Sequence, residues 1–351
     1  MNRRPLPDSY QDVDLDGMWN HLVSFADHWR ETVNLTADVD WRIDPDRIDR
    51  ICLAGMGGSA IGADLIRSYA APVSTRPVHV NRSYTVPGWV DERTLFVACS
   101  YSGNTEETLS ALAEAKKRGA QIVAVTSGGE LLLQASKEGF GYVRIPGGLP
   151  PRAALAYSFV PLFRLFSAIG DLPESDEVLD ATADQLEREA DLLSDPTHSQ
   201  ARTLALELRD TLPIIYTGPD LLESVGVRWR CQIEENAKTL AYGNTIPEMN
   251  HNEIVGWEQV AHLTGRLSMI QLEDEEDHPK GIQRARIVRE MLDDRVVHST
   301  RLVSAGPNRL ARQFSLIQLG DWVSYYLAVE QGVDPTPIAP IDLLKSRLSD
   351  D

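Results

Sequence analysis

The feature that most constrains the fold is a short apolar run that turns through glycines directly into a helical pattern, and it occurs twice in the 351-residue chain. RICLAGMGG, beginning at Arg50, leads into SAIGADLIRSYA, and LPIIYTG, beginning at Leu212, leads into LLESVGVRWRCQIEENAKTLAY. A buried strand followed at once by a helix is the first part of a βαβ unit, whose strands run parallel. The sequence therefore predicts an α/β protein.

Similar patterns follow each instance in the same order. The first is followed by a short strand near residues 77–80, the strand TLFVACS, a helix over 105–120 and the strand QIVAVTS. The second is followed by the strand LSMIQL, a helix over 280–294 and a strand over 296–303. This repetition predicts two related three-layer αβα domains, each with a mainly parallel sheet flanked by helices.

The length also favours two domains, because 351 residues exceed what one hydrophobic core usually organises. An acidic segment over residues 181–195, closed by Asp195-Pro196, places the expected boundary between residues 170 and 197. We expect an N-terminal helical extension over 1–45, a phosphate-binding domain over 46–180, a second domain over 196–333 and a tail over 334–351.

Charge and composition exclude several classes of partner. A formal charge of -18, without a basic cluster, repels nucleic acid and anionic lipid. The sequence contains neither a signal-peptide pattern nor a run approaching the ~20 apolar residues of a membrane helix. Three cysteines without a CxxC pair suit a reducing compartment. We expect a cytoplasmic protein that binds neither nucleic acid nor membranes.

A hydroxyl-rich segment, SYSGNT, follows the strand that begins at Thr94 and precedes a helix. Ser100, Ser102 and Thr105 could bind a phosphate there, together with free backbone N–H groups and the positive end of the helix dipole. The alternative is an ordinary polar helix cap made by Asn104 or Thr105. In the second half the acidic segment EDEEDHP takes this place, so we expect one phosphate site per chain.

The motif GMGGSA after the first strand matches the dinucleotide fingerprint GxGxxA. That fingerprint also expects an acidic residue at the end of the second strand, where this chain has Asn81 and Arg82. A bound sugar is the better interpretation: Gly57 and Gly58 would permit a close backbone approach, and Ser59 would contribute a hydroxyl contact.

Other candidates have two interpretations each. Arg152, in GGLPPRAAL, is either a solvated loop residue or a fixed cation for an oxyanion. Glu234 and Glu235 fall off the apolar stripe of their helix, so each is a solvent-facing residue or a general base. The predicted packing stripe of that helix is Leu222, Val225, Trp229, Ile233, Ala237 and Leu240.

His251 in PEMNHNEIVG and Lys345 in the tail are by default a structural histidine and a surface lysine. The eight histidines and three cysteines show no metal-ligand spacing such as HExxH, so we expect no metal.

Six motifs together resemble the bifunctional phosphoglucose/phosphomannose isomerases of archaea and bacteria, a branch of the phosphoglucose isomerase superfamily built from two sugar-isomerase (SIS) domains. The resemblance covers roughly residues 45 to 351. The motifs, in the family's order, are GMGGSAIGADL, SYSGNTEET, PPRAAL, EENAK, NHNEIVG and IDLLKSRL.

This resemblance implies a reaction and several residue roles. The reaction is the metal-independent, cofactor-free interconversion of glucose 6-phosphate, and of mannose 6-phosphate, with fructose 6-phosphate through a cis-enediolate, as in glycolysis and gluconeogenesis. Arg152 would stabilise the enediolate. The residues placed near the sugar and its phosphate are Ser59, Ser100, Ser102 and Thr105.

The remaining roles are also implied by the resemblance. The family's catalytic glutamate directly precedes Asn-Ala-Lys, which selects Glu235 as the base, and His251 with Lys345 matches the ring-opening pair. In relatives the histidine comes from the other subunit, which implies a homodimer. A threonine before the tail helix accompanies tolerance of mannose 6-phosphate in relatives; here Ile338 takes its place, with Thr336 two residues earlier.

Two alternatives belong to other classes of protein. A non-catalytic SIS-type sugar-phosphate sensor would usually carry a DNA-binding module, which the acidic charge opposes. An amino-sugar phosphate isomerase would either release ammonia or carry a glutamine-handling domain with an N-terminal cysteine nucleophile, and that domain is not expected in a chain that begins Met-Asn-Arg.

Overall fold

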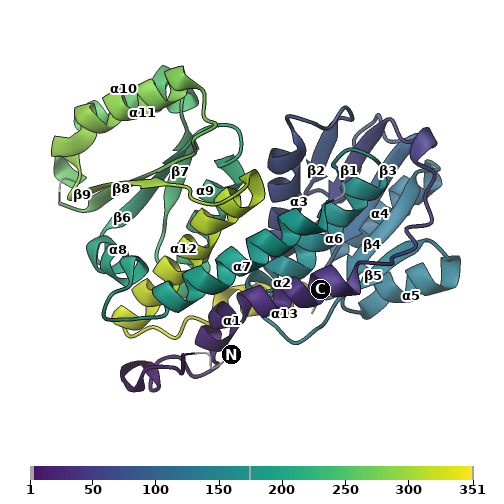
Figure 1. The fold of residues 1–351 in the computed structure, drawn as a ribbon, viewed down its shortest axis with the longest axis horizontal. Coiled ribbons are helices and arrows are strands. Elements are labelled where there is room, and N and C mark those ends of the chain that lie inside the picture. The colour runs from purple at the N-terminus through teal and green to yellow at the C-terminus, as the bar shows by residue number, and fades with distance from the viewer. Residues whose placement is uncertain (1–3, 174, 264, 350–351) are drawn as a thin grey trace. The chain divides into compact units, whose positions relative to one another are not determined.

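The computed structural model describes residues 4–173, 175–263 and 265–349, which fold into two compact units, each with its own sheet (Figure 1). We call these the first unit and the second unit. The first unit comprises residues 24–186, apart from residue 174, and 306–311; the second comprises 4–23, 187–305, apart from residue 264, and 312–349.

The first unit is built on a parallel five-stranded sheet with the strand order β2-β1-β3-β4-β5. Its apolar runs form the strands, and the helical patterns between them form the crossovers. The strands are β1 (Arg50–Ala54), β2 (Val78–Asn81), β3 (Thr94–Cys99), β4 (Gln121–Thr126) and β5 (Gly141–Arg144). The helices are α2 (Phe25–Leu35), α3 (Gly57–Ala70), α4 (Glu106–Lys117), α5 (Gly129–Glu138) and α6 (Leu155–Ala168), and α7 (Asp176–Leu193) continues into the second unit.

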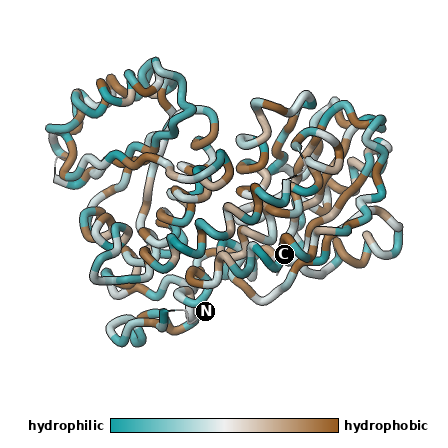
Figure 2. The backbone as a smooth tube through the Cα atoms, viewed as in Figure 1, coloured by the Kyte–Doolittle hydropathy of each residue, from teal (hydrophilic) through white to brown (hydrophobic). Residues whose placement is uncertain are grey.

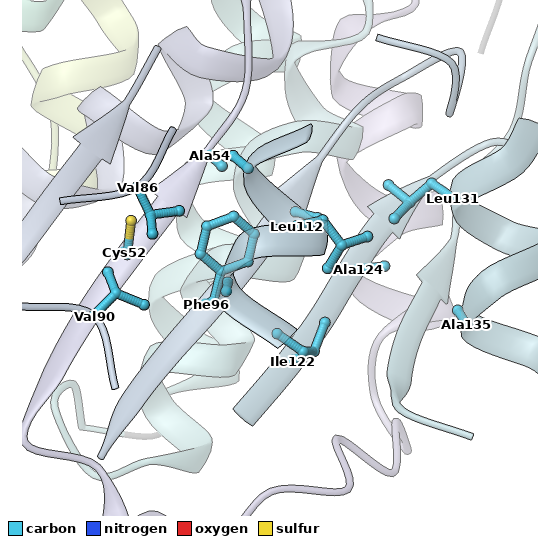
Figure 3. Packing of buried hydrophobic residues seen from close by; sticks show 13 residues of the cluster. Cys52, Ala54, Val86, Val90, Phe96, Leu112, Ile122, Ala124, Leu131 and Ala135 are labelled. Atoms are coloured by element: carbon cyan, nitrogen blue, oxygen red, sulfur yellow. The ribbon is translucent and has the colours of Figure 1, made fainter. Parts of the chain in front are cut away.

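One face of this sheet forms a core with α4 and α5. Phe96 on β3 lies at its centre, between Cys52 on β1 and Leu112 on α4, and Leu131 on α5 closes one end (Figure 3). Helices α3 and α6 pack on each other, and α3 also packs on β1 and β2. In Figure 2 the strands of this sheet are largely coloured as hydrophobic, as expected for parallel strands buried on both faces.

The second unit repeats this topology with a parallel four-stranded sheet in the order β7-β6-β8-β9. The shared order confirms the predicted α/β class with parallel sheets flanked by helices. The strands are β6 (Leu212–Thr217), β7 (Tyr242–Thr245), β8 (Leu267–Glu273) and β9 (His298–Val303). The helices are α1 (Met18–Val23), α8 (Gln200–Leu208), α9 (Glu223–Ala237), α10 (Glu253–Gly256), α11 (Pro279–Leu292), α12 (Arg309–Glu330) and α13 (Ala339–Ser349).

Helix α9 is fixed to α12 by buried polar contacts. Arg228 donates two hydrogen bonds to the carboxylate of Asp321, with N···O distances of 3.0 and 2.7 Å. The side chains of this ion pair are only 4% and 7% exposed. The Trp229 indole donates to the carbonyl of Leu316 at 2.7 Å, and a Cβ at Gly320 would lie 2.4 Å from the indole nitrogen. The two helices can therefore approach this closely only at a glycine.

The structure corrects two details of the sequence interpretation. Helix α9 ends at Ala237 and does not extend to Tyr242, because Lys238 adopts the left-handed conformation with φ 55°. Leu240 is consequently 65% exposed and does not join the packing stripe, although the other five residues of that stripe are buried. The residues that follow form β7, which we did not predict; nor did we predict β5.

No helix in the described residues is both long and apolar enough to cross a membrane.

Arg228→Met should lower the free energy of unfolding by about 3–5 kcal/mol, because it leaves the carboxylate of Asp321 buried without its cation. Denaturation with urea measures the change. Combining Arg228→Met with Asp321→Leu should recover most of the loss, since an apolar pair carries no desolvation cost. A double variant as unstable as the single one would contradict this account.

Candidate functional site

Hydroxyl groups gather at the carboxyl ends of β1 and β3 in the first unit. The Oγ of Ser100 and the Oγ1 of Thr105 are 2.8 Å apart, and the backbone N–H of Tyr101 donates to the Oγ of Ser59 at 3.1 Å. Ser59 belongs to the first turn of α3, so this bond joins the turn after β1 to the loop after β3. Ser102 is exposed on the same loop.

The structure argues against an ordinary polar cap on α4. Thr105 is the N-cap residue of α4, but its hydroxyl accepts no hydrogen bond from the described backbone N–H groups in the first turn of that helix. The Oδ1 of Asn104 accepts instead from the backbone N–H of Glu130, at 3.0 Å. The positive end of a 12-residue helix therefore faces the hydroxyl cluster without a capping side chain.

Glycine is required where these loops meet. A Cβ on Gly58 would lie 2.8 Å from the backbone carbonyl of Pro151, so the loop that carries Arg152 packs directly on the start of α3. Gly57 has φ +50°, and Gly103 has φ +72° with a hypothetical Cβ only 1.8 Å from the oxygen of Gly128. Gly58 and Gly103 thus permit close packing of backbone within the protein itself, whereas Gly57 has open space where a Cβ would lie.

Arg152 is not a solvated loop residue, since it is only 4% exposed. It lies in the 3-10 helix Pro151–Ala153, beside the first turn of α3. The first unit therefore places the loop that carries the buried Arg152 beside the turn with Gly58 and Ser59, and that turn is joined to the hydroxyl loop after β3.

Sequence reasoning missed Tyr101, which connects this loop to the segment before Arg152. Its hydroxyl accepts a hydrogen bond from the backbone N–H of Leu149 at 3.0 Å, and its carbonyl accepts one from the Oγ of Ser127 at 2.7 Å. Burial raises the pKa of Tyr101. A tyrosine between two serines carries no periodic signal that would have identified it.

The end of β2 is occupied by local contacts. Asn81 Nδ2 donates to the carbonyls of Ser83 and Thr85, each at 3.1 Å, and Arg82 pairs with Asp64. Asn81 therefore shapes the loop after β2 and does not present a carboxylate to a ribose.

In the second unit, Glu234 and Glu235 are half-buried in the last turn of α9. Burial raises the pKa of Glu234, and the charge of Glu235 raises it further. The next residue, Asn236, is fully buried and donates from Nδ2 to the Oγ of Ser324 at 2.9 Å. This bond fixes the rotation of the turn that carries both carboxylates.

His251 is exposed at the end of the 3-10 helix Glu248–His251. Two residues later, Glu253 accepts hydrogen bonds from the buried hydroxyl of Tyr216 and, at 2.7 Å, from Nδ2 of Asn244. The Trp257 indole donates to the same hydroxyl at 3.1 Å. Glu253 thus ties the histidine segment to β6 and β7, a role that the sequence did not reveal.

Lys345 is exposed on α13, and Ile338 directly precedes that helix, where its carbonyl accepts from the N–H of Ile341 at 2.8 Å. Glu235, His251 and Lys345 therefore lie on three different elements of the second unit.

The acidic loop of the second unit, which begins at Glu273, forms ion pairs with an arginine of the same unit. Arg312 is only 7% exposed and donates to the carboxylate of Asp274 at 3.0 Å, and it also pairs with Glu275 and Glu276. Where the first unit has hydroxyls, the second has internal ion pairs. Within the described residues, no group of three or more His, Cys, Asp or Glu is arranged to hold a metal ion.

Comparison with known proteins identifies the family. The chain is 40% identical over 343 residues to a bifunctional phosphoglucose/phosphomannose isomerase of Caldicellulosiruptor bescii, covering 95% of this chain and 99% of the relative. A protein of the same name from Thermoplasma acidophilum is 34% identical, covering 94% of this chain and 99% of that protein. The chain belongs to the bifunctional phosphoglucose/phosphomannose isomerase family.

Family models and solved structures agree with this membership. Residues 47–138 match the SIS domain, and residues 197–348 match the bacterial phospho-glucose isomerase C-terminal SIS domain. The crystal structure of a glucose-6-phosphate isomerase like protein from Thermus thermophilus has the same fold, with a TM-score of 0.62 at 21% identity, covering 96% of this chain and 99% of that one. The predicted fold and the predicted isomerase class are thus both confirmed.

The acidic loop of this isomerase-family chain should make stability depend on pH. Burial raises the pKa of Asp277 to about 6, so the folded protein retains a proton that the unfolded chain releases near pH 4. The stability that Asp277 contributes is therefore present below pH 4 and is lost as the pH rises through 6. Asp277→Asn should accordingly be more stable than the parent protein by about 1–2 kcal/mol at pH 7.5, with a smaller difference at pH 4.5.

Urea denaturation at the two pH values measures this gain. Asp294→Asn, which changes an aspartate whose side chain is 83% exposed, is the matched control and should show no pH-dependent difference. A gain for Asp277→Asn that is the same at both pH values would show that the carboxyl does not titrate as described.

Proposed function

We propose that the protein interconverts glucose 6-phosphate and mannose 6-phosphate with fructose 6-phosphate through a cis-enediolate, without a metal or redox cofactor. The observation that carries this proposal is similarity over 95% of the chain to a relative named for both activities. The hydroxyl cluster of the first unit supports it, because it offers uncharged donors suited to a phosphate.

The phosphate would bind to Ser100, Ser102 and Thr105 at the N-terminus of α4. Hydroxyls, loop N–H groups and the positive end of the helix can hold a dianion without a lysine. Ser59 would contact the sugar, and Gly57 and Gly58 would keep the turn after β1 compact. In a chain with a formal charge of -18, such a site must rely on local donors.

The proton transfer would use Glu235. Its carboxylate removes the proton from C2 of the open-chain aldose and returns it to C1, while the hydroxyl proton moves from O2 to O1; C2 then carries the carbonyl of the ketose. Arg152, buried and always charged, would stabilise the negative oxygen of the enediolate. His251 and Lys345 would open the ring before the transfer by moving the proton between the ring oxygen and the anomeric hydroxyl.

We further propose a cytoplasmic homodimer in which His251 is contributed across the interface. The exposure of His251 in the single chain supports this assignment, since its imidazole is accessible to a second copy. Glu253 would hold the histidine segment in place while the imidazole reaches outward.

Incubation of the purified protein with fructose 6-phosphate and excess EDTA tests the activity. Separate quantification of glucose 6-phosphate and mannose 6-phosphate should show both products. Glucose 6-phosphate alone would withdraw the mannose activity and point to Ile338 as its cause. No turnover, with retained binding of fructose 6-phosphate, would favour the sugar-phosphate sensor instead.

Substituting each of the two adjacent glutamates in turn tests which one is the catalytic base. Glu235→Gln should bind fructose 6-phosphate yet lose turnover by about three orders of magnitude or more, because the side chain keeps its shape without its basicity. Glu234→Gln is the matched control and should retain most of the kcat, although the raised pKa belongs to Glu234. If Glu234→Gln abolished turnover and Glu235→Gln did not, the assignment would be reversed.

A further inference from the structure

Lys238, the residue after α9, connects two segments of the second unit. Its Nζ donates to the backbone carbonyls of Glu235 at 2.6 Å and Asn236 at 3.3 Å. The same ammonium donates to the carbonyl of Pro335 at 3.2 Å. One side chain thus bonds both to the last turn of α9 and to the segment between α12 and α13.

The backbone of Lys238 shows that this arrangement carries a steric cost. Its φ of 55° and ψ of 29° place it in the left-handed region, where the C-cap of a helix is most often a glycine. A lysine is strained in this conformation, whereas a glycine is not. The side chain at this position is therefore better explained by its three hydrogen bonds than by the needs of the turn.

Those bonds have an evident physical basis. The last carbonyls of a helix have no partners within it, and they form the negative end of the helix dipole. An ammonium satisfies two of them here and leaves a third donor for Pro335. The neighbouring Thr239 adds a weaker contact, from its hydroxyl to Oε1 of Gln331 at 3.5 Å.

We infer that Lys238 is a positioning residue for the proton-transfer carboxylate. It would hold the turn that carries Glu235 against the segment that leads through Ile338 into α13, the helix of Lys345. This inference rests on the proposed function, because it requires Glu235 to be the base. Loss of the ammonium should leave the carboxylate present but poorly placed relative to C2 and C1.

Two variants test the inference. Lys238→Met keeps most of the aliphatic stem and removes the donor, and Lys238→Gly also relieves the backbone strain, so that it folds even if the methionine variant does not. Each should lower the kcat for glucose 6-phosphate by about 10- to 100-fold, with a change in KM of less than about two-fold, because small misplacements of a reacting group are costly.

The second readout is isotopic. In D2O, a misplaced carboxylate should exchange its proton with solvent more often before returning it, so the fructose 6-phosphate formed early should carry more deuterium at C1. A residue that only stabilises the fold would not change this fraction. Lys280→Met is the matched control, since Lys280 donates to Oε1 of Gln283 at 3.1 Å on α11, and both readouts should stay at parent values.

The outcomes separate the two proposals. Parent-like kcat and deuterium content in both Lys238 variants, together with a loss of turnover in Glu235→Gln, would overturn the positioning role alone. A lower kcat with unchanged deuterium content would also overturn it, because Lys238 would then affect a step other than proton transfer. Full turnover in Glu235→Gln would overturn the proposed base and this inference together.

Discussion

The contact between α9 and α12 determines where the carboxylates of Glu234 and Glu235, in the last turn of α9, lie. Apolar side chains hold the two helices together by close packing, and the Arg228–Asp321 pair, which is bidentate, buried and directional, adds a specific register to that packing. Gln232 donates to the same carboxylate at 2.9 Å, one turn further along α9. Buried polar groups are expensive unless all their bonds are made, so only one register of the two helices satisfies this set.

The two units show how one topology can carry different chemistry. The loop between β3 and α4 in the first unit corresponds to the loop between β8 and α11 in the second, and each connects a central strand to a crossover helix. In the first unit this loop exposes Ser102 and leaves the helix N-terminus without a capping side chain; in the second, the acidic loop is bound by Arg312. The fold fixes the location of the loop, and its side chains decide whether an anion can bind there.

How far the sequence predicts this molecule depends on the range of the interactions involved. Strands and crossover helices with strong patterns were predicted closely: β3 to within one residue at each end, and α4 to within one residue at its start and three at its end. The end of α9 was not, because a glycine would have marked the left-handed turn there, whereas Lys238 gives no local signal of it and its side chain bonds to Pro335, 97 residues away. The short strand β7 was missed because YGNT has no apolar pattern of its own.

The same distinction applies to the candidate site. The hydroxyls of SYSGNT are adjacent in sequence and could be grouped from it, but Tyr101 and Glu253 act through partners contributed by other elements. The burial of Arg152 was likewise undecidable from its loop, because it depends on the packing of that loop against Gly58. Residues whose surroundings come from distant parts of the chain carry a weak local signal.

The distribution of charge around the hydroxyl cluster suits the proposed reaction. Repulsion from an acidic surface is screened beyond about 8 Å at physiological salt, so a substrate that reaches the loop is governed by local groups. Neutral donors hold a phosphate equally well before and after proton transfer, and therefore contribute to binding more than to rate. A buried cation acts differently, because its field is poorly screened and favours the state in which a new negative charge appears. Confining the fixed positive charge to Arg152 and leaving the phosphate to hydroxyls would thus separate binding from the stabilisation of the enediolate.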